Sequence, residues 1–233
     1  MNRHTQAAVL CLLGVSLLHA GATDLSLRYV KAGLRPLLLV AGVVLVVAAV
    51  ATVWYERRGP ASDAHHEPRV SWLLLLPVLA LILIAPPALG SYSAMRTGTA
   101  LQRPPAYAPL PSGDPVRLGV VDYASRAAYD EGRTLRDRRV RITGFVALDR
   151  AGTPYLVRMA LNCCAADAQP VKIGLAGRVP PVLQPDSWLE VTGTYTPKRT
   201  RDPVGGGPIP YIDITSAEPV RAPADPYDES WNN

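Results

Sequence analysis

The sequence predicts N-terminal transmembrane α-helices, three with two as the alternative, followed by a small all-β OB-like barrel domain with one short helix. Three apolar stretches fill the first ninety residues, a proline-rich stretch follows, and the second half alternates apolar and polar residues in short runs. The proline-rich stretch favours a semi-rigid polyproline II spacer. These patterns divide the chain into a transmembrane region at 1–95, a linker at 96–116, an OB-like β domain at 117–220 and a disordered tail at 221–233.

The three expected spans cover residues 5–24, 36–55 and 71–90. A helix that crosses the hydrocarbon core needs about 20 predominantly apolar residues, and the second and third stretches meet this length. The first stretch is shorter, so a cleaved signal peptide is its alternative, with Arg3 as the positive start and LHAGA as the cleavage site. We favour a span, because further apolar residues after this stretch can extend the helix to the membrane interface.

The net charge of +5 comes mostly from residues that flank the apolar stretches. Lys and Arg outnumber Asp and Glu by eight to four through residue 100, but only by sixteen to fifteen after it. A nearly neutral β domain excludes bulk nucleic-acid binding, which needs a basic face. The basic residues on the two sides of the membrane are nearly balanced, so the positive-inside rule does not decide the orientation. We expect the C-terminal domain to be extracytoplasmic.

The β domain is expected to begin with one amphipathic helix at 122–131, with Asp122 at its N-cap. Bulges are expected at Gly144 and Gly193, because glycine within a strand permits the sharp coiling of a small barrel. The segment 198–210 is expected to be the loop between the last two strands. A small β-sandwich is the alternative to the OB-like barrel. The five expected strands lie at 140–148, 154–161, 171–175, 188–195 and 211–215.

Two adjacent cysteines and a carboxylate form the motif CCAADA at 163–168. Neighbouring cysteines do not readily form a disulfide with each other, because the bond would close a strained ring. Cys163 and Cys164 could bind zinc or copper(I) through thiolates, with Asp167 adding an oxygen. A zinc site needs four ligands, so another chain, a second copy or the membrane region would have to complete it. The simpler interpretation is structural: one cysteine packs in the barrel, the other lies on the opposite strand face, and Asp167 makes turn hydrogen bonds.

His19 is a second candidate metal ligand, because ionisable groups in membrane helices are rare and usually face a bundle interior. Asp24 and a partner helix could complete such a site, and Cys11 lies about two turns before His19. The alternative is a histidine at the membrane interface, satisfied by water or headgroups. His65 and His66 lie in a polar loop that is capable of weak metal capture. The sequence contains no catalytic triad order and no phosphate-binding glycine loop, so we expect no enzymatic activity.

The chain resembles a bacterial family of two-component membrane permease complex subunits and regulators. The resemblance extends over nearly the whole chain and rests on His19 with LRYV, on WLLLLP and APPALG in the third apolar stretch, on TGF at 143–145 and on NCCAADA at 162–168. It implies a multi-pass accessory or regulatory subunit in the bacterial cell membrane, partnered by a multi-span permease subunit and the lipid bilayer, with a role in handling metal ions. Zinc or another transition metal would be the ion. The alternatives are a thiol-based metal-binding or redox-sensing membrane protein and an OB-type module that binds an oligomeric ligand.

Overall fold

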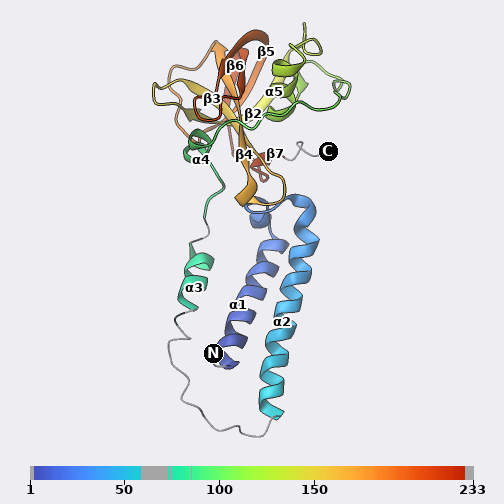
Figure 1. Ribbon diagram of the computed structural model, residues 1–233, viewed down its shortest axis with the longest axis vertical. Coiled ribbons are helices and arrows are strands. Elements are labelled where there is room, and N and C mark those ends of the chain that lie inside the picture. Colours follow the sequence, from blue (N-terminus) through green and yellow to red (C-terminus); the bar gives the residue numbers. More distant parts are fainter. Residues whose placement is uncertain (1–2, 59–72, 74, 85, 229–233) are drawn as a thin grey trace. The chain divides into compact units, whose positions relative to one another are not determined.

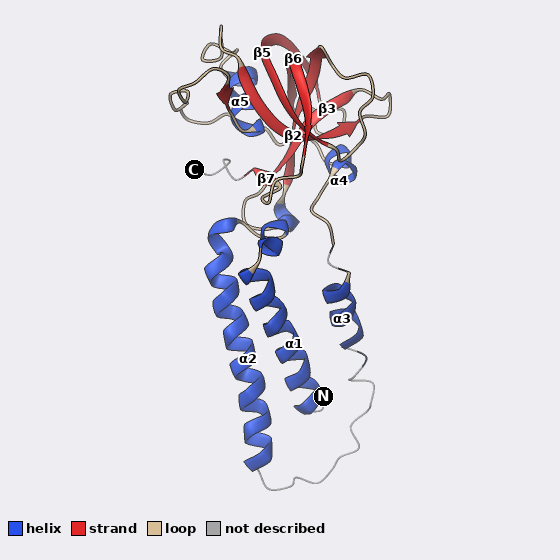
Figure 2. Cartoon of the chain, turned by 180° about the vertical axis from the view of Figure 1, so that it is seen from behind, coloured by secondary structure: helices blue, strands red, loops and turns tan. Residues whose placement is uncertain are grey.

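The computed structural model describes residues 3–58, 73, 75–84 and 86–228. The chain forms two compact units, Met1–Pro87 and Ala88–Asn233 (Figure 1). The first unit is helical and the second is built mainly of strands (Figure 2).

The first unit contains two long helices, α1 (Arg3–Ala22) and α2 (Arg35–Arg58), joined by the short 3-10 helices η1 (Asp24–Arg28) and η2 (Ala32–Leu34). Two helical segments, Arg3–Ala22 and Ala32–Arg58, are long and apolar enough to cross a membrane by length and composition. They correspond to the first and second expected spans. At the third expected span the described helix is α3 (Leu75–Leu83), with nine residues. Residues 71, 72, 74 and 85 of that span lie outside the described part of the chain.

Glycines bring α1 and α2 close together. A Cβ atom added at Gly14 would lie 2.8 Å from Val46 Cγ2, and one added at Gly42 would lie 2.8 Å from Leu18 Cγ. Small residues at a helix crossing let two backbones approach, which is a common way for helices to associate in membranes. The side of α2 that carries Val40, Val43, Val44 and Val47 is exposed. A run of exposed valines is unfavourable in water and matches the needs of a helix surrounded by lipid.

The second unit is a closed five-stranded β-barrel. In its ring, β2 pairs with β3, β3 with β4, β4 with β6, β6 with β5, and β5 again with β2. The β4–β6 pairing is parallel and the other four are antiparallel, which is the strand order of an OB-type barrel. The predicted fold class is therefore confirmed. The strands are β2 (Val140–Leu148), β3 (Pro154–Ala160), β4 (Gln169–Gly177), β5 (Trp188–Arg201) and β6 (Pro208–Val220), with short additions at β1 (Val116–Arg117) and β7 (Tyr227–Asp228).

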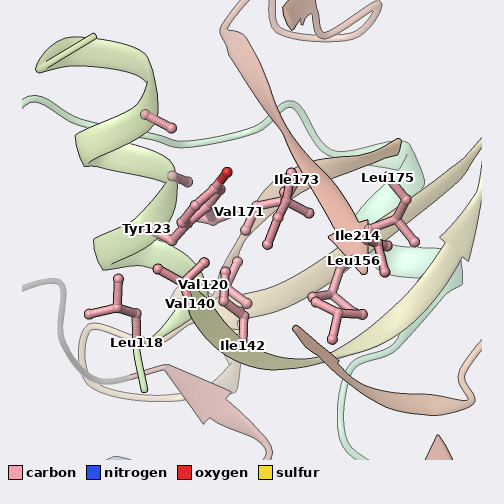
Figure 3. Close-up of a cluster of buried hydrophobic side chains, with 14 of the residues drawn as sticks. Leu118, Val120, Tyr123, Val140, Ile142, Leu156, Val171, Ile173, Leu175 and Ile214 are labelled. Atoms are coloured by element: carbon pink, nitrogen blue, oxygen red, sulfur yellow. The ribbon is translucent and has the colours of Figure 1, made fainter. Parts of the chain in front are cut away.

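The barrel core is filled by aliphatic side chains that alternate with outward-facing residues along the strands, and α5 (Val120–Tyr129) packs against it (Figure 3). Tyr123 on α5 is fully buried and donates a hydrogen bond of 2.8 Å to the carbonyl of Tyr211 on β6. The helix begins two residues earlier than predicted, with Gly119 as its N-cap. Asp122 is therefore in the first turn, where it pairs with Arg126 at 2.7 Å.

One of the two predicted bulges is present. The β5–β6 register shifts between Thr192 and Gly193, as expected for a bulge. The prediction at Gly144 is wrong, because this residue pairs with Leu189 in a continuous β2–β5 register. Gly144 instead permits close approach of β3, since a Cβ atom there would lie 2.8 Å from the carbonyl oxygen of Val157.

Strands β5 and β6 extend through most of the predicted loop at 198–210. Arg199 pairs with Pro210 and Arg201 with Pro208, which leaves a turn at 202–207. The end of β5 is charged and exposed, so it has no apolar alternation to reveal a strand. Its basic residues and Pro197 are features that protect a strand edge from pairing with other chains.

The proline-rich segment, predicted to be a spacer, belongs to the second compact unit. The backbone N–H of Ala100 donates to the carbonyl of Pro170 at 3.0 Å, and Tyr129 Oη donates to the carbonyl of Leu101 at 2.9 Å. The tail also contributes an ordered element, because Tyr227 in β7 is buried and Asp228 accepts a hydrogen bond from the start of α5. Residues 229–233 of the predicted tail lie outside the described chain.

Candidate functional site: a thiol loop between two barrel strands

The candidate site is the loop at 162–168, which joins β3 to β4 and is called the thiol loop below. It contains a single 3-10 turn, η4 (Ala165–Asp167), with Cys164 as its N-cap. Both flanking strands are part of the barrel ring, so the two ends of this short loop are fixed by the sheet.

Asp167 organises the thiol loop. Its Oδ1 accepts the backbone N–H of Asn162 at 3.1 Å, and its Oδ2 accepts those of Cys163 at 2.9 Å and Cys164 at 3.4 Å. A carboxylate that receives several backbone N–H groups closes a turn in the manner of a helix cap. The turn hydrogen bonds expected for Asp167 are therefore present.

The thiol loop gathers three candidate ligands. One ligand atom from each of Cys163, Cys164 and Asp167 lies within 4.8 Å of the other two. Cys163 is exposed and Cys164 is half-buried, and neither belongs to the two hydrophobic clusters of the barrel. The expected packing of one cysteine inside the barrel is thus not what the structure has. Two thiols and a carboxylate are a donor set that suits a thiophilic ion.

The charges within the thiol loop act on each other. Partial burial by itself would raise the pKa of Asp167, but hydrogen bonds from the Cys163 thiol and from the backbone N–H groups lower it below its ordinary value. The hydrogen bond to Asp167, followed by the one to Cys164, raises the pKa of Cys163 to about 12. Reactive redox cysteines have lowered pKa values. The raised pKa therefore disfavours a redox role for Cys163, and a metal ion bound there would have to displace the thiol proton.

His19, the fourth predicted ligand, lies on α1 in the other compact unit. Its side chain is exposed, and its backbone carbonyl accepts a hydrogen bond of 2.9 Å from Thr23 Oγ1. The carboxylate of Asp24 lies 3.9 Å from Arg35 Nη1. The structure thus pairs Asp24 with an arginine of the same unit. His65 and His66 lie outside the described residues.

The barrel also contains a buried ion pair that no sequence motif predicts. Lys172 Nζ lies 2.7 Å from Asp202 Oδ2, with side-chain exposures of 1% and 0%. Lys172 also donates to the carbonyl of Thr97 at 2.9 Å, and Asp202 accepts the backbone N–H of Thr99 at 2.9 Å and of Val204 at 2.8 Å. Burial alone would raise the pKa of Asp202, but these hydrogen bonds and the charge of Lys172 lower it. The pair holds the chain after α4 (Ser91–Arg96) against β4 and the β5–β6 turn.

The outer face of β2 and β3 is covered by the chain itself. Residues of α4 and of the strands form a second hydrophobic cluster there, in which Ala94, Phe145 and Val157 are buried. Asp186 fixes α4 in place by accepting the backbone N–H of Ser91 at 2.6 Å and its hydroxyl at 2.9 Å. In OB folds oligomers bind on the second and third barrel strands, which are β3 and β4 here; the cluster covers the β3 part, and Lys172 on β4 is buried against the carbonyl of Thr97.

A depression of about 470 Å³ at the start of α5 brings three arginines together. Arg141 lies 3.5 Å from the carboxylate of Glu190. Arg158 donates to the carbonyl of Tyr227 at 2.7 Å and stacks over Trp188 with its guanidinium 5.0 Å from the ring centre. Arg141 and Arg158 are therefore used inside the domain, which leaves the thiol loop as the stronger candidate.

Comparison with known families gives a match to the second unit. Residues 125–228 match the model of the DUF1980 C-terminal domain. The match runs from α5 to β7, so it includes the barrel and the thiol loop and leaves α1 and α2 outside. No curated protein and no solved structure matches the chain.

Proposed function

We propose that the chain is a membrane-anchored accessory subunit of a permease complex, and that its thiol loop receives a thiophilic metal ion and presents it to the permease. The observation that carries the proposal is the gathering of Cys163, Cys164 and Asp167 within 4.8 Å on an exposed loop. The apolar helices α1 and α2 supply the anchor. The proposal adds a third span at 71–90 and an extracytoplasmic barrel. The permease partner follows from the family resemblance of the sequence.

The exposure of the thiol loop supports transfer of the ion over permanent storage. A structural zinc site is closed by four protein ligands, whereas this loop offers three donors and leaves one side open. An open, exposed site can receive an ion from a donor and release it to an acceptor. The proposed role is therefore delivery or capture of the ion at the membrane.

The covered outer face of β3 and β4 argues against the alternative of an OB-type ligand module. An oligomeric ligand would have to displace α4, which is fixed by the Asp186–Ser91 hydrogen bonds and by buried apolar contacts. The barrel is better suited to hold the thiol loop rigidly than to bind an oligomer on its strands.

The proposal is tested by purifying the tagged full-length chain from its native membranes in mild detergent. We expect a multi-span transport protein to co-purify, and we expect the variant C163S/C164S to change the cellular content of zinc or copper. The third cysteine supplies the control, because C11S leaves the thiol loop intact and should behave as wild type. Isolation of the chain alone, with cellular metal unchanged in C163S/C164S, would reject the proposal. Recovery of the chain in the soluble fraction without detergent would reject the anchor.

A further inference from the structure

The ligand set of the thiol loop indicates which ion it holds, and within this set Asp167 already has several hydrogen-bond donors. Its two oxygens accept three backbone N–H groups, from Asn162, Cys163 and Cys164, in addition to the Cys163 thiol. A carboxylate offers about four acceptor positions, so backbone donors fill three of them, and the fourth holds a thiol whose proton a metal would displace. Drawing Asp167 to a metal would remove the acceptor from three backbone donors and open the turn that places the thiols. Asp167 is therefore suited to positioning the two cysteines rather than to binding the ion.

The two cysteines are the ligands that remain. The second unit contains no histidine, since all four histidines of the chain precede residue 88. Among the residues that the structure describes, the potential metal-ligating group at this loop consists of Cys163, Cys164 and Asp167. With Asp167 occupied by backbone hydrogen bonds, two thiolates remain. Zinc in proteins is almost always bound by four ligands, or by three protein ligands and water at catalytic sites.

The two thiols lie close to each other. The ligand atoms lie within 4.8 Å of one another, and two metal–sulfur bonds of about 2.3 Å reach about 4.6 Å in a line. The two sulfur atoms are therefore close enough to bind the same ion. Such two-coordinate thiolate binding is stable for the soft monovalent d¹⁰ ions copper(I) and silver(I), which thiolate sites favour.

We propose that Cys163 and Cys164 bind one copper(I) ion through two thiolates, and that Asp167 is a positioning residue that does not touch the ion. On binding, two S–H bonds break, two copper–sulfur bonds form and two protons are released to solvent, with no change in the oxidation state of copper or sulfur. This inference rests on the proposed function, because it names the ion that the thiol loop handles.

The experiment uses the purified full-length chain in detergent under reducing conditions. The chain is titrated with copper(I) against a chromophoric copper(I) chelator and, separately, with zinc against a zinc chelator. We expect one copper(I) per chain, zinc binding that is at least about tenfold weaker, and an X-ray absorption spectrum with sulfur neighbours only. C163S and C164S should each remove copper(I) binding, whereas C11S should retain it.

Asp167 is tested with D167N against a matched control. Asp149 likewise accepts backbone N–H groups in a turn, from Ala151 and Thr153 at 2.8 Å each, so D149N should leave copper(I) binding unchanged. Loss of a residue that orients ligands lowers metal affinity by about 10–100-fold. We expect D167N to weaken binding in this range, while the bound copper keeps its two sulfur neighbours.

The outcomes separate this inference from the proposed function. Tighter binding of zinc than of copper(I), with dependence on both cysteines, would overturn the copper(I) assignment and leave metal handling intact. An oxygen neighbour of the ion that disappears in D167N would overturn the positioning role. Absence of binding for both ions would overturn the inference together with metal handling by the thiol loop.

Discussion

The buried pair between Lys172 and Asp202 gives a quantitative prediction about the stability of the barrel. D202A leaves the Lys172 ammonium, which is 1% exposed, with the carbonyl of Thr97 as its acceptor. It also removes the acceptor of the Thr99 and Val204 N–H groups. Removal of one partner from a buried ion pair costs about 3–5 kcal/mol. For a domain of this size each kcal/mol lowers Tm by about 2–4 °C, so we expect a loss of about 6–20 °C.

Replacement of the other partner, Lys172, should cost less stability. K172M leaves the carboxylate of Asp202 buried, but that carboxylate keeps the backbone N–H groups of Thr99 and Val204. Hydrogen bonds from backbone donors stabilise a buried carboxylate, so D202A should be the more destabilising of the two changes. The assay is thermal unfolding of the full-length chain in detergent, followed by near-ultraviolet circular dichroism.

The control pair has the same distance and a different environment. Arg139 Nη2 and Asp114 Oδ2 are also 2.7 Å apart, but their side chains are 55% and 58% exposed. Water screens this pair, so D114A should leave Tm nearly unchanged. Two results would refute this explanation of the buried pair. One is a D202A variant with the same Tm as D114A, and the other is a K172M variant with a lower Tm than D202A.

Three further substitutions test the core and the thiol loop. Y123F removes the 2.8 Å hydrogen bond to the carbonyl of Tyr211, and chemical denaturation should show a loss of about 0.5–1.5 kcal/mol. G174A places a Cβ atom 2.5 Å from the Tyr211 ring, so the same assay should show a loss of about 1–3 kcal/mol, and an unchanged midpoint would contradict this packing. Because the pKa of Cys163 is raised to about 12, its alkylation rate should rise about tenfold per pH unit from pH 7 to 9. D167N should lower that pKa and speed alkylation at pH 7, and a rate unaffected by D167N would be the contrary result.

The sequence predicted the barrel well where strands lie over the core. The alternation in 140–148 matches β2 at both ends, because every second side chain there points into the apolar interior. Prediction from sequence failed where strands extend beyond the core. The end of β5 is held by backbone pairing to β6, and its exposed side chains show no alternation of apolar and polar residues. Gly144 and Gly193 look alike in sequence, yet only the register of the neighbouring strands decides that Gly193 is the bulge.

The candidate site was predicted in part for similar reasons. Cys163, Cys164 and Asp167 are close in sequence, so a short turn necessarily brings them together. The partnership of Lys172 with Asp202 spans 30 residues and a strand crossover, so no local pattern could reveal it. The position of α4 on the barrel was also hidden, because its buried contacts are with residues far along the chain.

The central claim, that the thiol loop handles a metal ion, is tested most directly by alkylating all three cysteines of the full-length chain with a membrane-permeant maleimide. The reaction is run with and without added copper(I) or zinc, and each cysteine is quantified by mass spectrometry. We expect at least one of these ions to protect Cys163 and Cys164 together and to leave Cys11 as reactive as before. Equal modification of Cys163 and Cys164 with and without both ions would contradict it.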